Sequence, residues 1–139
     1  MRSPTQIVAL DVALLDIPLH VPFGISGGAQ AMANNVLVTV TLADGTRGYG
    51  EAAPLPPYNG ETQAMALAAL RSAQAWLPGR EAADWRGLAA EFFRKGGAGC
   101  GSAQCAFEIA LIDALTKQAG QPLWKFFGGA STTLETDMT

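Results

Sequence analysis

The sequence predicts an α+β protein in which a three-stranded antiparallel meander comes first and a bundle of helices follows. Three observations predict this order. Apolar and β-branched residues alternate with period two in the first third of the chain, and an Asp-Gly pair separates two of these runs. The later part is rich in Ala and Leu at helical spacing. Strands followed by helices are typical of the α+β class.

The composition is that of a soluble, globular domain. The chain has 139 residues, of which 49% are hydrophobic and 15% are charged, and its formal net charge is −3. This length suits one domain with one core. The absence of a basic excess argues against a nucleic-acid partner, and no apolar run is long enough for a membrane span or a signal peptide. We therefore expect a cytoplasmic protein with neither nucleic acid nor membrane as a partner.

The first strand is expected at residues 7–19, a run rich in Val, Leu and Ile that Pro18 brings to an end. Residues 21–35 follow. Pro22, Gly24 and two further glycines make this segment unsuitable for a regular element, so we expect a mobile loop here.

The second strand has the strongest signal. Residues 34–42 alternate, with Val36, Val38 and Val40 on one face, and β-branched residues favour extended structure. The Asp-Gly pair at residues 44–45 is typical of a tight hairpin. The third strand is then expected at residues 47–51.

The helical part begins after a second irregular loop, residues 52–60, which contains three prolines and an Asn-Gly pair. A first helix is predicted from residue 61 to about residue 76, where Pro78 and Gly79 follow. A second helix is predicted after Asp84, which has the residue type of an N-cap.

A third helix is predicted at residues 103–118, with Ser102 as its cap. A stripe of small residues along one side of this helix should allow close packing: Ala103, Ala106, Ala110 and Ala114. A short helix is expected from Pro122 to the Gly128-Gly129 pair. Residues 132–139 alternate again and predict one more strand, which has no evident partner in the meander.

Several segments, in this order and spacing, resemble the N-terminal capping domain of the enolase superfamily. The nearest subgroup comprises muconate lactonizing enzymes, o-succinylbenzoate synthases and dipeptide epimerases. The matching segments are Pro22-Phe23-Gly24, the hairpin from Asp44 to Ala52, Asn59-Gly60-Glu61-Thr62, the helical segment from Ala110 to Leu115, and the turn from Gln121 to Gly129.

The resemblance implies a division of the chain and a chemistry. Residues 1–131 would be the capping domain, and residues 132–139 would begin the first strand of a (β/α) barrel that the sequence lacks. In such enzymes a base removes a proton α to a carboxylate, and Mg²⁺ stabilises the resulting enolate. The bases and metal ligands of the family lie on barrel strands, so no catalytic residue or metal ligand is carried over to this chain. We expect the fragment alone to be inactive.

The resemblance also implies that two loops close over the barrel mouth and contact the substrate. The residues expected to do so are Phe23, Gly24, Ile25 and Ser26 in the first loop, and Leu55 and Tyr58 in the second. No Lys or Arg lies between Arg2 and Arg47, which suits an apolar or small substrate end better than an acidic one. The parent enzyme could be an epimerase of hydrophobic dipeptides, a muconate cycloisomerase or an o-succinylbenzoate synthase.

The partners expected are the missing barrel, a small carboxylate substrate such as a dipeptide, and further copies of the protein. Leu123, Trp124 and Phe127 should be partly exposed without a barrel, and residues 132–139 should favour dimers or strand exchange. The alternative is a stand-alone, non-catalytic module for partner binding or dimerisation. A small-molecule binding protein that uses the loops alone is a third interpretation.

The carboxylates are not expected to form a metal site in this chain. Asp11 and Asp16 lie on opposite faces of a strand, and Glu108 and Asp113 point in different directions from a helix. We expect Asp113, in apolar surroundings, to hydrogen-bond local backbone.

Overall fold

The β-sheet follows directly from the alternating sequence. The structure, a computed structural model, describes residues 3–25 and 28–136. Strands β1 (Ile7–Ile25), β2 (Gly28–Leu42) and β3 (Arg47–Ala52) form an antiparallel three-stranded sheet in the order β1-β2-β3. The turn between β2 and β3 is the predicted hairpin, in which Gly45 has a φ of 89°. The predicted α+β class and the three-stranded meander are confirmed.

The first loop was predicted wrongly. Residues 21–25 and 28–35 are not irregular, because β1 continues to Ile25 and β2 already begins at Gly28. The two strands pair with each other beyond the body of the sheet, which satisfies their backbone groups despite the prolines and glycines. Near the prolines the pairing register between β1 and β2 is interrupted, between Pro18 and Phe23.

The helices occupy most of the predicted ranges. Helix α2 (Gln63–Ser72) continues into a short 3₁₀ turn at Ala73–Ala75, and its N-cap is Thr62, whose hydroxyl accepts a hydrogen bond from the Met65 amide. The remaining helical elements are α1 (Pro56–Asn59), 3₁₀ turns at Ala82–Asp84 and Gly97–Gly99, α3 (Trp85–Lys95), α4 (Gly101–Gln118) and α5 (Leu123–Phe126). Helix α1 lies inside the second loop, for which no helix was predicted. In the described part of the chain no helix is both long enough and apolar enough to span a membrane.

Two of the predicted helix caps differ from expectation. Asp84 is the N-cap of α3, as predicted, but its side chain makes no capping hydrogen bond. Ser102 is not a cap, because α4 already begins at Gly101 and its N-cap is Cys100. A carboxylate distant in sequence, Glu61, accepts the first amides of α4 instead.

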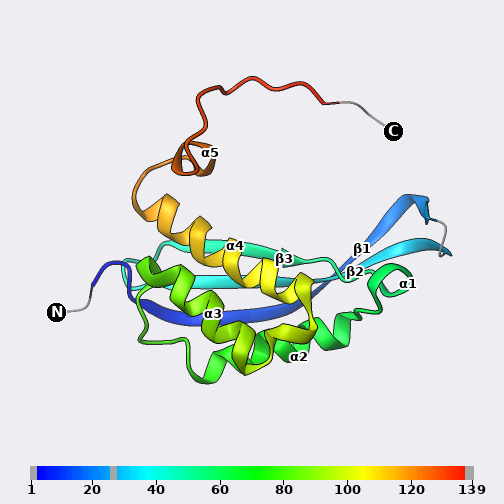
Figure 1. Cartoon of the computed structure of the whole chain (residues 1–139), viewed down its shortest axis with the longest axis horizontal. Coiled ribbons are helices and arrows are strands. Elements are labelled where there is room, and N and C mark those ends of the chain that lie inside the picture. The colour runs from blue at the N-terminus through cyan, green and yellow to red at the C-terminus, as the bar shows by residue number, and fades with distance from the viewer. Residues whose placement is uncertain (1–2, 26–27, 137–139) are drawn as a thin grey trace.

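The core lies between one face of the sheet and helices α2, α3 and α4 (Figure 1). The alternating valines of β2 are fully buried, as the sequence predicts: Val36, Val38 and Val40. On the helix side, Phe92 and Phe107 stack with their ring centroids 4.4 Å apart.

Helix α4 packs so closely on β3 that the strand needs glycine. A Cβ atom placed on Gly48 would overlap the Ala110 carbonyl oxygen and the Ala114 amide, and one on Gly50 would overlap the Ala106 carbonyl oxygen. The predicted stripe of small residues on α4 therefore faces the two glycines of the hairpin motif. The glycines and the alanines together allow the backbones of helix and strand to touch.

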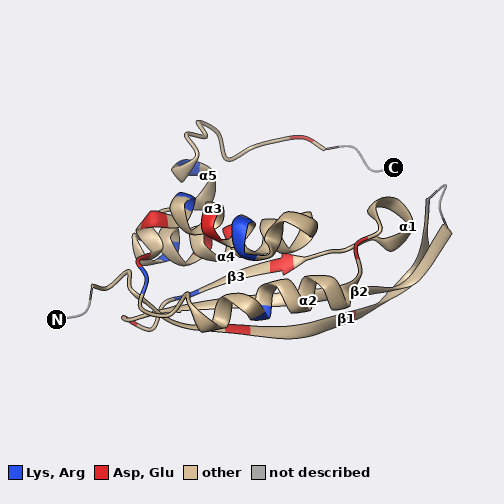
Figure 2. Ribbon diagram, turned by 60° about the horizontal axis from the view of Figure 1, so that its bottom comes forward, with Lys and Arg blue, Asp and Glu red and all other residues tan. Residues whose placement is uncertain are grey.

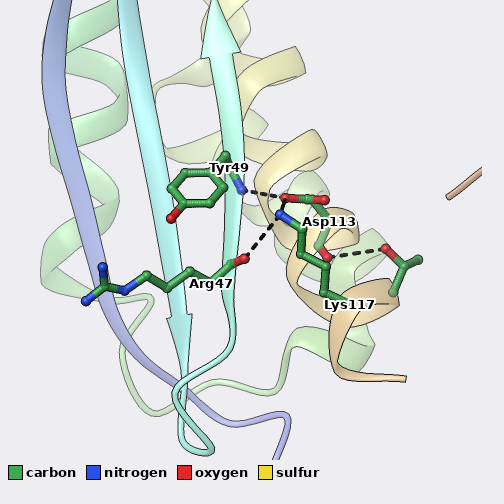
Figure 3. Close-up of polar contacts among 5 residues, drawn as sticks. Arg47, Tyr49, Asp113 and Lys117 are labelled. Carbon is green, nitrogen blue, oxygen red and sulfur yellow. Dashed lines mark hydrogen bonds and ion pairs between the residues drawn. The ribbon is translucent and has the colours of Figure 1, made fainter. Parts of the chain in front are cut away.

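The outer edge of β3 is tied to α4 by polar contacts (Figure 3). The Asp113 carboxylate accepts a hydrogen bond of 2.8 Å from the Tyr49 amide and forms a 2.6 Å ion pair with Lys117. The Lys117 ammonium also lies over the Tyr49 ring, 4.8 Å from its centroid. The carboxylate thus bonds to backbone, as expected, but to a strand distant in sequence and not to its own helix. This contact occupies an amide that would otherwise be unpaired at the sheet edge.

The end of the chain departs from expectation. Residues 132–136 form no strand, and residues 137–139 lie outside the described residues. A strand requires a partner for its backbone groups, and the three strands of the sheet are already paired in the order β1-β2-β3 without this segment. Leu123, Trp124 and Phe127 are exposed, as predicted.

Candidate functional site

A two-stranded ribbon projects from the sheet beyond the ends of helices α2, α3 and α4 (Figure 1). We call this ribbon, residues 16–25 and 28–34, the arm. Its strands pair closely near the tip, where Phe23 lies opposite Gln30 and Ile25 lies opposite Gly28. The sequence contains no Lys, Arg, Asp or Glu between Asp16 and Asp44. Beyond Asp16, at its base, the described part of the arm therefore has no charged residue, and its ribbon is tan in Figure 2.

The second loop, which begins at residue 53 because β3 extends to Ala52 and which contains α1, lies beside the arm and forms a groove with it. The groove has a volume of about 310 Å³. Its lining comes from both strands of the arm, from the start of the second loop and from the residue next to the arm on β2: Leu19, Phe23, Gln30, Ala33, Asn35, Ala53, Pro54 and Leu55. Two segments separated in sequence by the whole of β3 therefore face each other across one apolar hollow.

The structure brings together two of the predicted site residues, Phe23 and Leu55. The Phe23 side chain is 55% exposed although it is aromatic and apolar, and Leu55 is half-buried. Such exposure in a concave, apolar region is typical of a surface that a ligand or another part of the protein covers.

The other predicted residues do not line the groove. Gly24 pairs with Ala29 within the arm, and the backbone of Ile25 lies at its end. Tyr58, on α1, is 81% exposed and is not part of the lining. Ser26 lies outside the described residues.

The sequence-based prediction missed Gln30 and Asn35, the two polar residues of the lining. The signal that could have identified them is the pairing register of the arm, which places Gln30 opposite Phe23. Because residues 21–35 were predicted to be a loop, no strand pairing was predicted there that could place Gln30 near Phe23. No Lys, Arg, Asp or Glu lines the groove, so it offers shape and two amide groups but no formal charge.

Comparison with known proteins identifies the family of this chain. A family model for the N-terminal domain of mandelate racemase / muconate lactonizing enzymes matches residues 7–128. This chain belongs to that family. The predicted resemblance to the enolase superfamily is thereby confirmed, and both the arm and the second loop lie inside the matched region.

Relatives within the mandelate racemase / muconate lactonizing enzyme family include dipeptide epimerases. An aromatic dipeptide epimerase from Herpetosiphon aurantiacus is 48% identical over 98% of this chain, and this chain spans 38% of that protein. A solved structure of a mandelate racemase/muconate lactonizing protein from the same organism superposes with a TM-score of 0.90 at 47% identity, over 98% of this chain and 38% of that one. A dipeptide epimerase from Cytophaga hutchinsonii, complexed with Mg and the dipeptide D-Ala-L-Val, superposes with a TM-score of 0.83 at 30% identity, over 92% of this chain and 34% of that one.

The described residues of this chain do not form a magnesium site. Among residues 3–25 and 28–136, no group of three or more His, Cys, Asp or Glu side chains could hold a metal ion. Several of the carboxylates have structural partners instead: Asp16 with Gln63, Glu51 with Asn35, and Asp113 with Tyr49 and Lys117. The described part of this family member therefore contains an apolar groove of about 310 Å³ and no cluster of metal-binding side chains.

Proposed function

We propose that this chain is the capping domain of a dipeptide epimerase, and that the groove between the arm and the second loop holds a side chain of the substrate. The observation that carries the proposal is that Phe23 and Leu55 line one groove although they come from different segments. In this role the arm and the loop would exclude water from the reacting part of the substrate and fix its distal end.

The groove favours an apolar substrate side chain. Its volume of about 310 Å³ lies at the lower end of the range for small-molecule sites. A charged side chain placed there would lose hydration without gaining a counter-ion, because no charged residue lines the groove. The 48% identity with an aromatic dipeptide epimerase supports the same substrate class. A dipeptide with an aromatic or large aliphatic residue is thus the proposed substrate.

The chemical step would belong to the rest of the protein. We propose that residues 1–131 form the cap and that Mg²⁺ is bound by residues outside this chain. We also propose that residues 132–139, of which residues 132–136 form no strand here, become the first barrel strand when they pair with the rest of the protein. Proton removal α to the carboxylate would likewise depend on residues outside this chain, so the fragment alone would be inactive. We also propose a cytoplasmic homo-oligomer, with dimers or strand exchange through the Thr132–Thr139 region in the isolated fragment.

The test uses the whole protein that contains this segment, with Mg²⁺ and a panel of L,L-dipeptides in deuterium oxide. Incorporation of deuterium at the α-carbon, followed by NMR, reports proton removal directly. We expect exchange with Ala-Phe or Ala-Leu and little with Ala-Glu. A protein that exchanges the α-proton of none of the dipeptides would contradict the proposed function, and preference for Ala-Glu would contradict the proposed substrate class.

A further inference from the structure

Four polar side chains meet where the arm leaves the sheet. The Gln63 side chain, at the start of α2, donates two hydrogen bonds from Nε2, one of 2.7 Å to Asp16 Oδ1 and one of 2.9 Å to the Asn35 carbonyl oxygen. Gln63 therefore bonds to β1 and β2 at neighbouring positions of their pairing, because Asp16 lies opposite Asn34, the residue before Asn35.

The third strand joins the same cluster. The Asn35 side chain donates from Nδ2 to Glu51 Oε1 at 2.6 Å. Asn35 is only 9% exposed, and Asn35 and Thr116 are the two buried polar residues in the described part of the chain. We call Asp16, Asn35, Glu51 and Gln63 the brace. It connects all three strands to α2.

The brace connects the two sides of the groove. Asp16 and Asn35 stand at the base of the arm, whereas Glu51 lies shortly before the second loop and Gln63 shortly after it. Asn35 also lines the groove, together with Phe23 and Leu55. A shift of the brace would therefore move the two walls of the groove relative to each other.

The arm has little else to hold it. None of its described residues is buried, from 16 to 24 or from 28 to 34. Its strands pair with each other, which keeps the ribbon intact but does not fix its angle to the sheet. Apolar burial therefore contributes little to the position of the arm, which makes the hydrogen bonds at its base important for its angle to the sheet.

We propose that the brace is a positioning device for substrate selection: by fixing the arm against the second loop, Gln63 sets the width of the groove. This inference rests on the proposed function, and its new content is the role of residues that do not themselves need to touch the substrate. Loss of Gln63 should weaken binding of dipeptides with large apolar side chains while the chemical step stays nearly unchanged.

The first test measures the arm itself in the 139-residue chain. Gln63→Ala removes both donated hydrogen bonds. Gln74→Ala is the matched control, because Gln74 belongs to the 3₁₀ turn after α2 and donates to the Leu10 carbonyl oxygen on β1, away from the arm. In Gln63→Ala we expect amide hydrogen exchange to become about tenfold faster in the arm and to stay unchanged in the β2–β3 pairing. In Gln74→Ala the arm should exchange as in the wild type.

The second test measures kinetics of the whole protein with Ala-Phe. We expect Gln63→Ala to raise KM about tenfold and to change kcat by less than about twofold, since a loose groove loses binding and not chemistry. Gln74→Ala should leave both constants unchanged.

The two measurements separate the possible failures. If the wild-type protein epimerises no dipeptide, the proposed function fails, and hydrogen exchange still decides whether the brace holds the arm. Unchanged exchange in the arm of Gln63→Ala overturns the brace. Equal acceleration throughout the sheet also overturns it, because the residue would then only stabilise the fold. Faster exchange in the arm with an unchanged KM overturns the link to substrate selection.

Discussion

The Glu61 carboxylate caps a helix that begins 40 residues later: its Oε1 accepts a hydrogen bond of 2.7 Å from the Gly101 amide. Its Oε2 accepts another, of 3.0 Å, from the Ser102 amide. These are among the first amides of α4, which have no partner within the helix. A negative charge at this position also interacts favourably with the helix dipole. Glu61 thereby joins the end of the second loop to the central helix of the core.

Replacement of Glu61 by alanine should destabilise the fold. The variant leaves two amides of α4 without their acceptor, and we expect the free energy of unfolding to fall by about 1–2 kcal/mol, as for loss of other N-terminal caps. Urea denaturation followed by circular dichroism measures this change. Asp11→Ala is the control, because Asp11 is exposed and its side chain has no hydrogen bond or ion pair with any described residue. Equal stability of Glu61→Ala and the wild type would show that water replaces the carboxylate without cost.

The same carboxylate should make stability depend on pH. Hydrogen bonding by the Ser102 side chain, aided by the Ser102 and Gly101 amides and the Cys100 thiol, holds the pKa of Glu61 below its ordinary value of 4.5. A group whose pKa is lower in the folded than in the unfolded state stabilises the fold above the unfolded value. Its contribution is lost as the pH falls through 4.5 toward the lower folded value.

Glu61→Gln isolates this effect. We expect the wild type to lose its stability advantage over the variant progressively as the pH falls below 4.5, as measured by urea unfolding at several pH values. Asp44 and Glu91, whose pKa values are also lowered, titrate in both proteins and cancel in the difference. A difference that stays constant across this range would contradict the lowered pKa of Glu61.

Helix α4 should not tolerate a side chain at Gly48. The Cβ atom of Gly48→Ala would overlap backbone atoms of Ala110 and Ala114, which can move only if the helix shifts from the strand. Overpacking of this kind typically costs about 1–3 kcal/mol, so the melting temperature should fall by several degrees. Gly99→Ala is the matched control, because a Cβ atom there has no neighbour within 4 Å. Similar melting temperatures for the two variants would mean that α4 moves without cost.

Asp113 should stabilise the edge of the sheet. In Asp113→Ala the Tyr49 amide loses its acceptor and Lys117 loses its ion pair, and we expect a loss of about 1 kcal/mol. Lys117→Met removes the ion pair together with the contacts of the ammonium with the Tyr49 ring and the Arg47 carbonyl oxygen, but keeps the hydrogen bond from the Tyr49 amide to Asp113. It should cost less, because exposed ion pairs contribute little. Thermal unfolding of both variants separates the two contributions. A larger loss for Lys117→Met would assign the stabilisation to the ion pair.

Local patterns predicted the body of the fold correctly. The alternation of Val36, Val38 and Val40 identified the buried face of β2, because a half-buried strand has to alternate. The spacing of the alanines on α4 likewise predicted close packing. The sequence did not show that the partners of this stripe are Gly48 and Gly50, since this contact depends on how helix and strand are placed in space.

The errors arose where distant segments decide the local structure. Pro22 and Gly24 disfavour a strand, yet β1 continues through them to Ile25, and residues 23–25 pair with residues 28–30 of β2. Ser102 has the residue type of a cap, yet Glu61 takes that role from a loop distant in sequence. The groove was predicted only in part for the same reason. Phe23 and Leu55 could be inferred from a resemblance, whereas Gln30 and Asn35 required the register of the arm.

The most direct test of the groove compares Phe23 with Tyr58. Both are exposed aromatic residues that the sequence predicted at the site, but only Phe23 lines the groove. In the whole protein, Phe23→Ala should lower kcat/KM for Ala-Phe by about tenfold, since removing an aromatic contact of this size costs roughly 1–2 kcal/mol. Tyr58→Ala is the matched control and should change kcat/KM by less than about twofold. Because the Phe23 side chain is 55% exposed, its loss should leave the melting temperature nearly unchanged, so a fall in kcat/KM would reflect a lost contact with substrate and not unfolding. Equal effects of the two variants would place the substrate outside this groove.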